Sequence, residues 1–307
     1  MIVWLAALAL QAAANPAPPP PPPMHGGPQQ TTCPVGGERF EALVTSHYST
    51  HGARPDGMPG TYWYMPLPLP ECPSNGLVVF EQFTPAQIAS LTILIASPDY
   101  RRLVAEDSTY YRAQWLATRI GLSEHRALWL LLAATWQVKP ARGTIGQPMP
   151  SPTKAEQYQR EFVSRVLALP PSPLDPSYII LFARAANAER ELGHFENAAT
   201  MLIRLSAWLA HSDRAQWQEA VSEPEDWLQF AAALAPVIAR NDSALEPLDM
   251  ADEYDAPWLC IEPELPLTEF NRAFCARAEL QAGIAEARQR RAEVGREIPP
   301  EEPPRPQ

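Results

Sequence analysis

The middle of the chain has apolar residues at the three- and four-residue spacing of amphipathic helices, and this pattern constrains the fold most. It begins near Thr84, where the preceding glycine- and proline-rich sequence ends. In the segment 123–138, one face carries the residues expected in the core, which are Ala127, Leu130, Leu131, Ala134 and Val138. Trp129 and Trp136 lie on an adjoining face, which predicts that this helix is buried on two sides.

Proline, glycine and capping residues divide this region into separate helices. Thr84 followed by Pro85 is a helix start, and Gly121 followed by Ser123 ends one helix and begins another. The predicted helices begin at Pro85 and cover about 109–120, 123–138, 153–169, 177–191, 195–211, 214–221, 224–240 and 267–293. The expected fold class is therefore mainly α.

One stretch, 179–207, resembles a tetratricopeptide repeat, a helix pair of about 34 residues. Ala186 and Ala198 stand at the small positions of the two helices, Gly193 lies in the turn, and Phe195 is at the aromatic position after it. Small residues allow two helix backbones to approach closely. The resemblance implies helical hairpins that stack on their neighbours.

The same stretch departs from the repeat pattern at two positions. Glu189 stands where the repeat usually has an apolar or aromatic residue, and Leu205 where it has a small one. No closing proline follows. A generic helical bundle is therefore the alternative architecture.

The first fourteen residues are typical of an export signal. An apolar run from Ile2 to Leu10 precedes Ala12-Ala13-Ala14, which fits an A-x-A cleavage site after Ala14. The run has no Lys or Arg before it, and an uncleaved short anchor is the alternative. It is too short to span about 30 Å of hydrocarbon. We expect a periplasmic or secreted protein without a stable membrane span after cleavage.

The four cysteines are an even number that an oxidising compartment can pair completely. They are Cys33, Cys72, Cys260 and Cys275. Proximity along the chain favours the pairs 33–72 and 260–275, although sequence alone leaves the other two pairings open.

Residues 31–82 are expected to form a small irregular module. Short strands are predicted within 39–48, 61–69 and 76–80, with the prolines of 66–70 restricting the second to an edge. Such a unit buries little core by itself, so a disulfide would stabilise it.

Three stretches together resemble an uncharacterised bacterial family: CPVGGERF (33–40), residues 61–84 and residues 110–136. That family has two N-terminal Cys-Pro-x-Cys zinc knuckles followed by tetratricopeptide-like helices. Gly36 and Asn75 stand here in place of the second cysteine of each knuckle. Four thiolates would hold one structural zinc ion. The resemblance therefore implies the architecture but not the metal site, and it implies no reaction.

Two histidines keep a metal site open as an alternative. His47 and His51 lie four residues apart and would complete a Cys₂His₂ set with Cys33 and Cys72. The competing interpretations are a Cys33–Cys72 disulfide and two surface histidines. A hydrolase-like site built on His47, His51 and Asp56 is the enzymatic alternative.

Charge and the absence of known motifs limit the function classes. The formal net charge is −11, which argues against a nucleic-acid partner. No phosphate-binding loop, dinucleotide fingerprint or zinc-protease motif is present, so no cofactor is expected. Residues 242–264 contain eight carboxylates without the spacing of a calcium loop, and we interpret them as a solvated acidic loop.

The expected organisation joins these segments. It comprises a signal peptide (1–14), a disordered proline-rich leader (15–30), the small module (31–82), a helical domain (83–240), an acidic loop with a C-terminal helix packed on it (241–293) and a disordered tail (294–307). The expected function is a non-enzymatic scaffold that binds a protein or peptide through helical-hairpin surfaces.

Overall fold

The computed structural model describes residues 26–44, 49–61, 65–140, 150–212, 214–217, 222–263 and 265–297 of the chain. The expected signal peptide, most of the proline-rich leader, His47 and the tail from residue 298 lie outside the described residues. Nothing in the structure therefore bears on those predictions.

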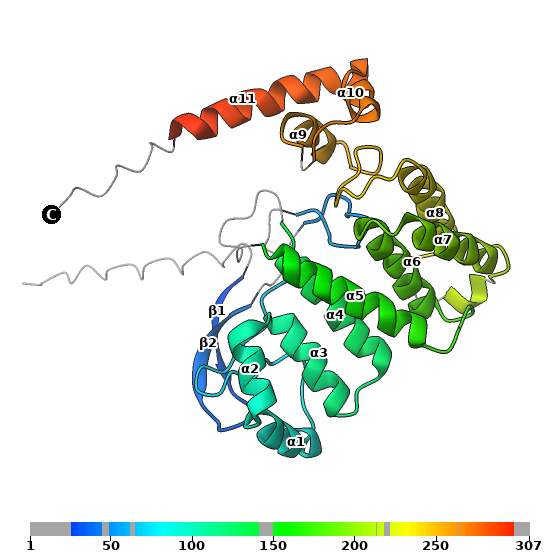
Figure 1. The fold of residues 1–307 in the computed structure, drawn as a ribbon. Coiled ribbons are helices and arrows are strands. Elements are labelled where there is room, and N and C mark those ends of the chain that lie inside the picture. The colour runs from blue at the N-terminus through cyan, green and yellow to red at the C-terminus, as the bar shows by residue number, and fades with distance from the viewer. Residues whose placement is uncertain are drawn as a thin grey trace, which may run out of the picture.

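The described chain is mainly α-helical, as predicted, with one small antiparallel β-ribbon near its N-terminal end (Figure 1). Its helices are α1 (Pro85–Ile95), α2 (Pro98–Glu106), α3 (Thr109–Arg119), α4 (Glu124–Val138), α5 (Pro152–Ala168), α6 (Pro176–Glu191), α7 (Phe195–Leu209), α8 (Pro224–Ala239), α9 (Asp255–Ile261), α10 (Glu269–Cys275) and α11 (Gln281–Glu297). Two 3₁₀ turns, η1 (Arg214–Trp217) and η2 (Ala278–Leu280), complete the helical elements.

Local sequence signals set most of the helix starts. The Thr84 side chain accepts a hydrogen bond from the Gln87 backbone amide, and the Gln87 side-chain oxygen accepts one from the Thr84 backbone amide, forming a capping box at α1. Gly121 and Gly193 adopt positive φ angles of 81° and 79° in the turns after α3 and α6. Residues with a side chain attached at Cβ rarely adopt this conformation, so glycine stops each helix there.

Helices α3 to α8 form an array in which each helix packs against the next along the chain. Helix α6 also contacts α4 and α8, so these three helices form one layer of the array. The predicted helix pair at 179–207 is present as α6 and α7. Ala186 and Ala198 are fully buried at their contact, and Phe195 packs against the core.

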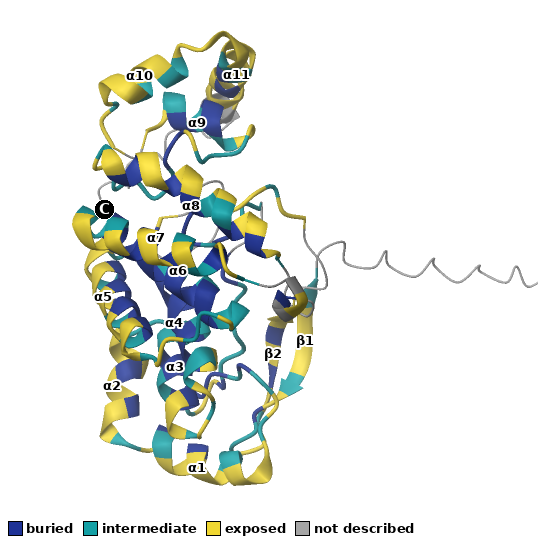
Figure 2. Ribbon diagram, turned by 90° about the vertical axis from the view of Figure 1, so that its right-hand side faces the viewer, coloured by how far each residue is buried: buried dark blue, intermediate teal, exposed yellow. Residues whose placement is uncertain are grey.

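Helix α4 is buried on two sides, as its sequence predicted. Ala127 and Leu130 belong to an N-terminal core shared with α1, α2 and α3. Leu128 and Leu131 belong to a second core shared with α5 to α8. Figure 2 shows the resulting continuous buried layer through α4 and α6. The helix therefore joins the two cores into one packed unit.

The β-ribbon pairs β1 (Gly27–Thr32) with β2 (Arg39–Val44), with Thr32 opposite Arg39. Residues 27–30 were expected in the disordered leader, and that boundary was wrong. The strand predicted within 76–80 is reduced to an isolated bridge between Glu71 and Val78, and the described part of 61–69 forms no strand. Prolines between residues 66 and 70 remove the backbone donors that a strand needs.

Three helical predictions also need correction. Helix α2 was not predicted, although Ser97 caps it and Pro98 begins it. The helix expected over 267–293 is two helices, α10 and α11, separated by η2. Of the helix predicted at 214–221, the described part forms only the 3₁₀ turn η1.

The part of the chain described here contains no helix with both the length and the apolar character needed to cross a membrane.

Candidate functional site

The two predicted disulfides are present. Cys33 pairs with Cys72, and Cys260 pairs with Cys275. The Cys33–Cys72 bond is buried in the N-terminal core, so the alternative zinc set of Cys33, Cys72, His47 and His51 is wrong. An oxidised pair offers no thiolate to a metal.

Asn75 connects the two cysteine turns in a way the sequence did not suggest. Its side-chain amide donates a hydrogen bond of 3.0 Å to the Val35 carbonyl oxygen, and its side-chain oxygen accepts one of 2.9 Å from the Leu77 amide. A polar residue in place of the second knuckle cysteine thus bridges the turns that the disulfide joins.

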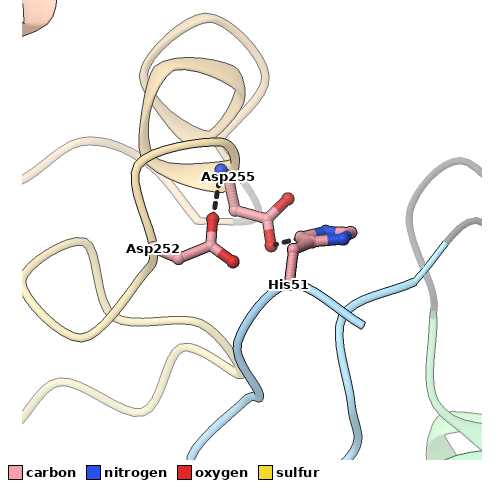
Figure 3. A group of neighbouring side chains, drawn as sticks. All are labelled: His51, Asp252 and Asp255. Atoms are coloured by element: carbon pink, nitrogen blue, oxygen red, sulfur yellow. Dashed lines mark hydrogen bonds and ion pairs between the residues drawn. The ribbon is translucent and has the colours of Figure 1, made fainter. Parts of the chain in front are cut away.

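His51 lies beside two aspartates from the acidic run instead of the cysteines (Figure 3). Its Nε2 atom is 3.8 Å from Oδ2 of Asp255. One candidate ligand atom from each of His51, Asp252 and Asp255 lies within 4.8 Å of the others. The two aspartates are separated from the histidine by about two hundred residues of sequence, and only the fold brings them together.

Local contacts hold the three side chains of this cluster. One carboxylate oxygen of Asp252 accepts hydrogen bonds from the backbone amides of Tyr254 and Asp255, at 2.9 and 2.8 Å. The other approaches Gly52, where an added Cβ would lie 2.7 Å from it. The His51 ring packs on Gly60, where a Cβ would lie 3.1 Å from Nε2. Two glycines therefore allow the close approach.

A small cavity of about 60 Å³ reaches the cluster. Besides His51, Asp252 and Asp255, Thr61 and Glu246 contribute to its walls. A cavity needs roughly 10–15 Å³ to hold one water molecule, so this one has room for a few water molecules.

Asp56, a candidate for the hydrolase-like site, is instead part of a buried ion network. Its carboxylate binds Arg54 at 2.6 Å and Lys139 at 2.9 Å, and its side chain is 4% exposed. Burial opposes ionisation of Asp56, but the charges of Arg54 and Lys139 outweigh it and hold the pKa of this carboxyl well below its usual range. Asp56 therefore stays ionised and paired, which does not suit a general base.

The network continues into the helical array. Lys139, directly after α4, also binds Glu191 of α6 at 2.7 Å. Glu191 accepts further hydrogen bonds from Gln159 of α5 and Asn187 of α6. The network thus links segment 49–61 to the end of α4 through Lys139, and Lys139 to α6 through Glu191.

Arg184 of α6 holds the same segment from a second side. Its Nη1 atom donates a 2.7 Å hydrogen bond to the Pro55 carbonyl oxygen. Its guanidinium stacks 4.8 Å from the Trp227 ring centroid and 5.1 Å from that of Phe230, both on α8. Burial lowers the pKa of Arg184 to about 10, with the charge of Asp56 opposing the shift. Segment 49–61 therefore lies against α4 and α6, and Figure 1 shows it as the blue trace beside α6.

A second, larger cavity of about 450 Å³ lies beyond the end of α8. We call it the C-terminal cavity. Its apolar lining consists of Ala244, Pro247, Leu248, Leu259, Pro263, Leu265, Pro266, Leu267 and Phe270. The Arg240 guanidinium lies 4.2 Å from the Phe270 ring centroid and is itself held by Asp242 and Asp249, at 3.1 and 2.6 Å.

One wall of this cavity is a loop closed by a disulfide. The Cys260–Cys275 bond spans 15 residues, and the enclosed segment carries Leu265 and Phe270, which are 43% and 37% exposed. Asn271 lies in the same wall. Its side-chain oxygen is buried and has no hydrogen-bond partner among the described residues. A buried acceptor without a donor costs about 1–3 kcal/mol, so it marks a place suited to a ligand donor.

The sequence alone did not indicate a functional role for Asp252, Asp255 or Asn271. The acidic run 242–264 was interpreted as a solvated loop, but it contains α9, and Asp242, Asp249 and Asp252 all have partners. One weak signal for a helix start was present in the sequence. Asp252 is followed three residues later by the acidic Asp255 and then by an apolar stretch. No signal in the sequence linked it to His51.

Of the other described histidines, His211 Nδ1 lies 2.8 Å from the Ala207 carbonyl oxygen, and the remaining two form simple ion pairs. His125 lies 3.7 Å from Asp175, and His194 pairs with Glu189. Neither belongs to a group of three metal-binding side chains in the described ranges.

Comparisons with protein-family models, with curated proteins and with solved structures find no match to this chain.

Proposed function

We propose that the protein is an exported binding scaffold that holds an apolar peptide segment of a protein partner in the C-terminal cavity. The observation that carries the proposal is the side-chain oxygen of Asn271, which lines the cavity together with its apolar residues and has no hydrogen-bond partner among the described residues. An extended peptide would place its apolar side chains against the leucines of the cavity lining, and one of its backbone N–H groups would donate a hydrogen bond to this oxygen.

The size and construction of the cavity support this proposal. Its volume of about 450 Å³ lies within the range of about 300–1,000 Å³ that ligand sites usually have. The Cys260–Cys275 disulfide and the Arg240–Phe270 contact fix one wall before a ligand arrives. Pre-organised walls lower the entropy lost on binding, which favours affinity.

The inner face of the helical array, which is the face that α4 and α6 present to segment 49–61, is less suited to a partner than the C-terminal cavity. Segment 49–61 lies on this inner face, and its Arg54 and Asp56 side chains are 7% and 4% exposed. Displacing the segment would take the Asp56 carboxylate away from the buried charge of Lys139, which would keep only Glu191 as its ion-pair partner in the network. The chain's own loop thus takes the place that a peptide would occupy in a helical-hairpin scaffold.

The two disulfides support export, because they persist in oxidising compartments. The resemblance to the zinc-knuckle family fits the same proposal if the Cys33–Cys72 bond joins the two turns that the metal joins in that family. We propose a periplasmic or secreted location on these grounds.

The experiment is a selection of displayed random peptides on the folded full-length chain, followed by affinity measurements on variants. We expect apolar peptides whose affinity falls about tenfold in Asn271→Ala and Phe270→Ala. A tenfold loss corresponds to about 1.4 kcal/mol, the size of one unsatisfied hydrogen bond. Ile93→Ala on α1 and Ile203→Ala on α7 are matched controls, because these residues are 75% and 72% exposed but lie elsewhere.

Peptides that bind Asn271→Ala and Phe270→Ala as tightly as the unaltered chain would refute the cavity as the site. Equal losses in the Ile93 and Ile203 variants would indicate non-specific apolar adhesion and would refute it as well.

A further inference from the structure

We propose that His51, Asp252 and Asp255 form a binding site for a divalent transition-metal ion, with zinc as the best-suited ion. The site lies where segment 49–61 meets the turn before α9 (Figure 3). It is separate from the C-terminal cavity and does not depend on the function proposed for that cavity.

The ligand types determine the class of metal. The site offers one imidazole nitrogen and two carboxylates, and zinc commonly takes both kinds of ligand. Calcium and magnesium prefer sites made of oxygen atoms alone. Two carboxylate charges together balance a divalent cation, whereas the single charge of a surface His–Asp pair does not.

The distances are near those that a metal requires. Bonds of about 2.0–2.1 Å in a tetrahedral zinc site place the ligand atoms about 3.3 Å from one another. His51 Nε2 and Asp255 Oδ2 are 3.8 Å apart, and all three ligand atoms lie within 4.8 Å. Movement of the side chains toward one another would complete the site.

The surroundings hold the ligands in place. The oxygen of Asp252 that binds the Tyr254 and Asp255 amides fixes the direction of its carboxylate. Gly60 supports the His51 ring, and the Tyr254 ring meets it edge to face with centroids 5.7 Å apart. The adjoining cavity of about 60 Å³ leaves space for water on the remaining coordination positions.

Metal binding at this position would fasten two parts of the chain that are far apart in sequence. His51 belongs to the segment fixed on α4 and α6, whereas Asp252 and Asp255 lead into α9 and its disulfide-linked partner α10. The ion is therefore expected to slow local opening on both sides of the site at once.

The test is a zinc titration of the full-length, tag-free chain after removal of metals with a chelator. Affinity is measured by calorimetry and by competition with a chromophoric chelator. We expect one zinc ion per chain and an affinity at least tenfold lower in His51→Asn and in Asp255→Asn. Asp252 is not substituted, because its carboxylate also binds two backbone amides.

His125→Asn is the matched control. His125 lies 3.7 Å from Asp175 with similar exposure, but it has no third ligand. Its variant should bind zinc like the unaltered chain. Hydrogen exchange should slow on zinc addition within both 49–61 and 251–261, and only in variants that keep the site.

The proposal would be overturned if zinc did not bind stoichiometrically, or if His51→Asn and Asp255→Asn bound zinc as tightly as the unaltered chain. It would also be overturned if calcium competed for the site as well as zinc does. Zinc uptake only after reduction of the disulfides, unaffected by His51→Asn, would instead place the metal on the cysteines. The peptide affinities of the cavity variants are measured separately, so either proposal can fail without the other.

Discussion

At the scale of single residues, the buried charges are organised around Asp56. It binds Arg54 and Lys139, and Lys139 binds Glu191, with each of these side chains less than a tenth exposed. Ion pairs of this kind contribute little net stability when formed, but removing one partner leaves the other buried and unpaired. The network therefore fixes the position of segment 49–61 more than it adds to the free energy of folding.

Asp56→Asn is expected to lower the free energy of unfolding by about 3–5 kcal/mol, because Arg54 and Lys139 then lack their shared carboxylate. Urea unfolding followed by circular dichroism measures the change. Glu156→Gln serves as control, since its pair with Arg160 is more than half exposed and should cost at most about 0.5 kcal/mol. Similar losses in the two variants would contradict the role of the network.

Acidification should remove the same contribution. The folded-state pKa of Asp56 lies well below its usual range, so its stabilising effect is complete above the unfolded-state pKa of about 3.9. The effect is lost as the pH falls below about 4 towards the folded-state pKa. Urea midpoints between pH 7 and pH 2 should therefore converge for the unaltered chain and Asp56→Asn. A constant difference across this range would contradict the assignment.

At the scale of elements, most described helices with strong local signals were predicted, except α2, which was missed despite Ser97 and Pro98 at its start. Elements without such signals were also missed. Thr84 with Pro85 and Gly193 with Phe195 mark boundaries by their own chemistry, so α1 and the turn between α6 and α7 were found. Strand β1 lies in polar, glycine-containing sequence and forms because β2 pairs with it. Helix α9 is only seven residues long, too short for its apolar spacing to be recognised.

The site could be predicted only in part for a related reason. His51 and the cysteines were singled out as chemically capable residues, and proximity along the chain favoured the two disulfide pairs that the structure contains, without excluding the other pairings. The partners of His51 depend on a contact between distant segments, which no local pattern reports.

The N-terminal disulfide is expected to contribute more to stability than the C-terminal one. The Cys33–Cys72 bond closes 39 residues and Cys260–Cys275 closes 15, which correspond to about 4 and about 3 kcal/mol on the loop-entropy model. Replacing Cys33 and Cys72 by serine should also loosen α1 and α2, because they share the core of that bond. Thermal unfolding of the two double-serine variants measures both effects.

Labelling with a thiol reagent in denaturant without reductant provides the corresponding check on the bonds themselves. No cysteine should react before reduction, and four should react after it. Four reactive thiols in the unreduced chain would contradict both bonds and weaken the proposal of export.

At the scale of the whole molecule, a helical array has its inner face covered by its own N-terminal segment, and a C-terminal unit extends beyond it (Figure 2). The buried network and Arg184 hold the segment in place. The described surface then offers the C-terminal cavity as the site for a partner, with the His51 cluster at the junction between the two parts.

Hydrogen exchange of the full-length chain, with and without a selected apolar peptide, tests whether the C-terminal cavity is the site where a partner binds. We expect the peptide to slow exchange within 240–248 and 265–271, which line the C-terminal cavity. Exchange within 49–61 and 179–191 should not change. Slower exchange along α4 and α6, or faster exchange of 49–61 as the peptide displaces it, would contradict the C-terminal cavity as the binding site.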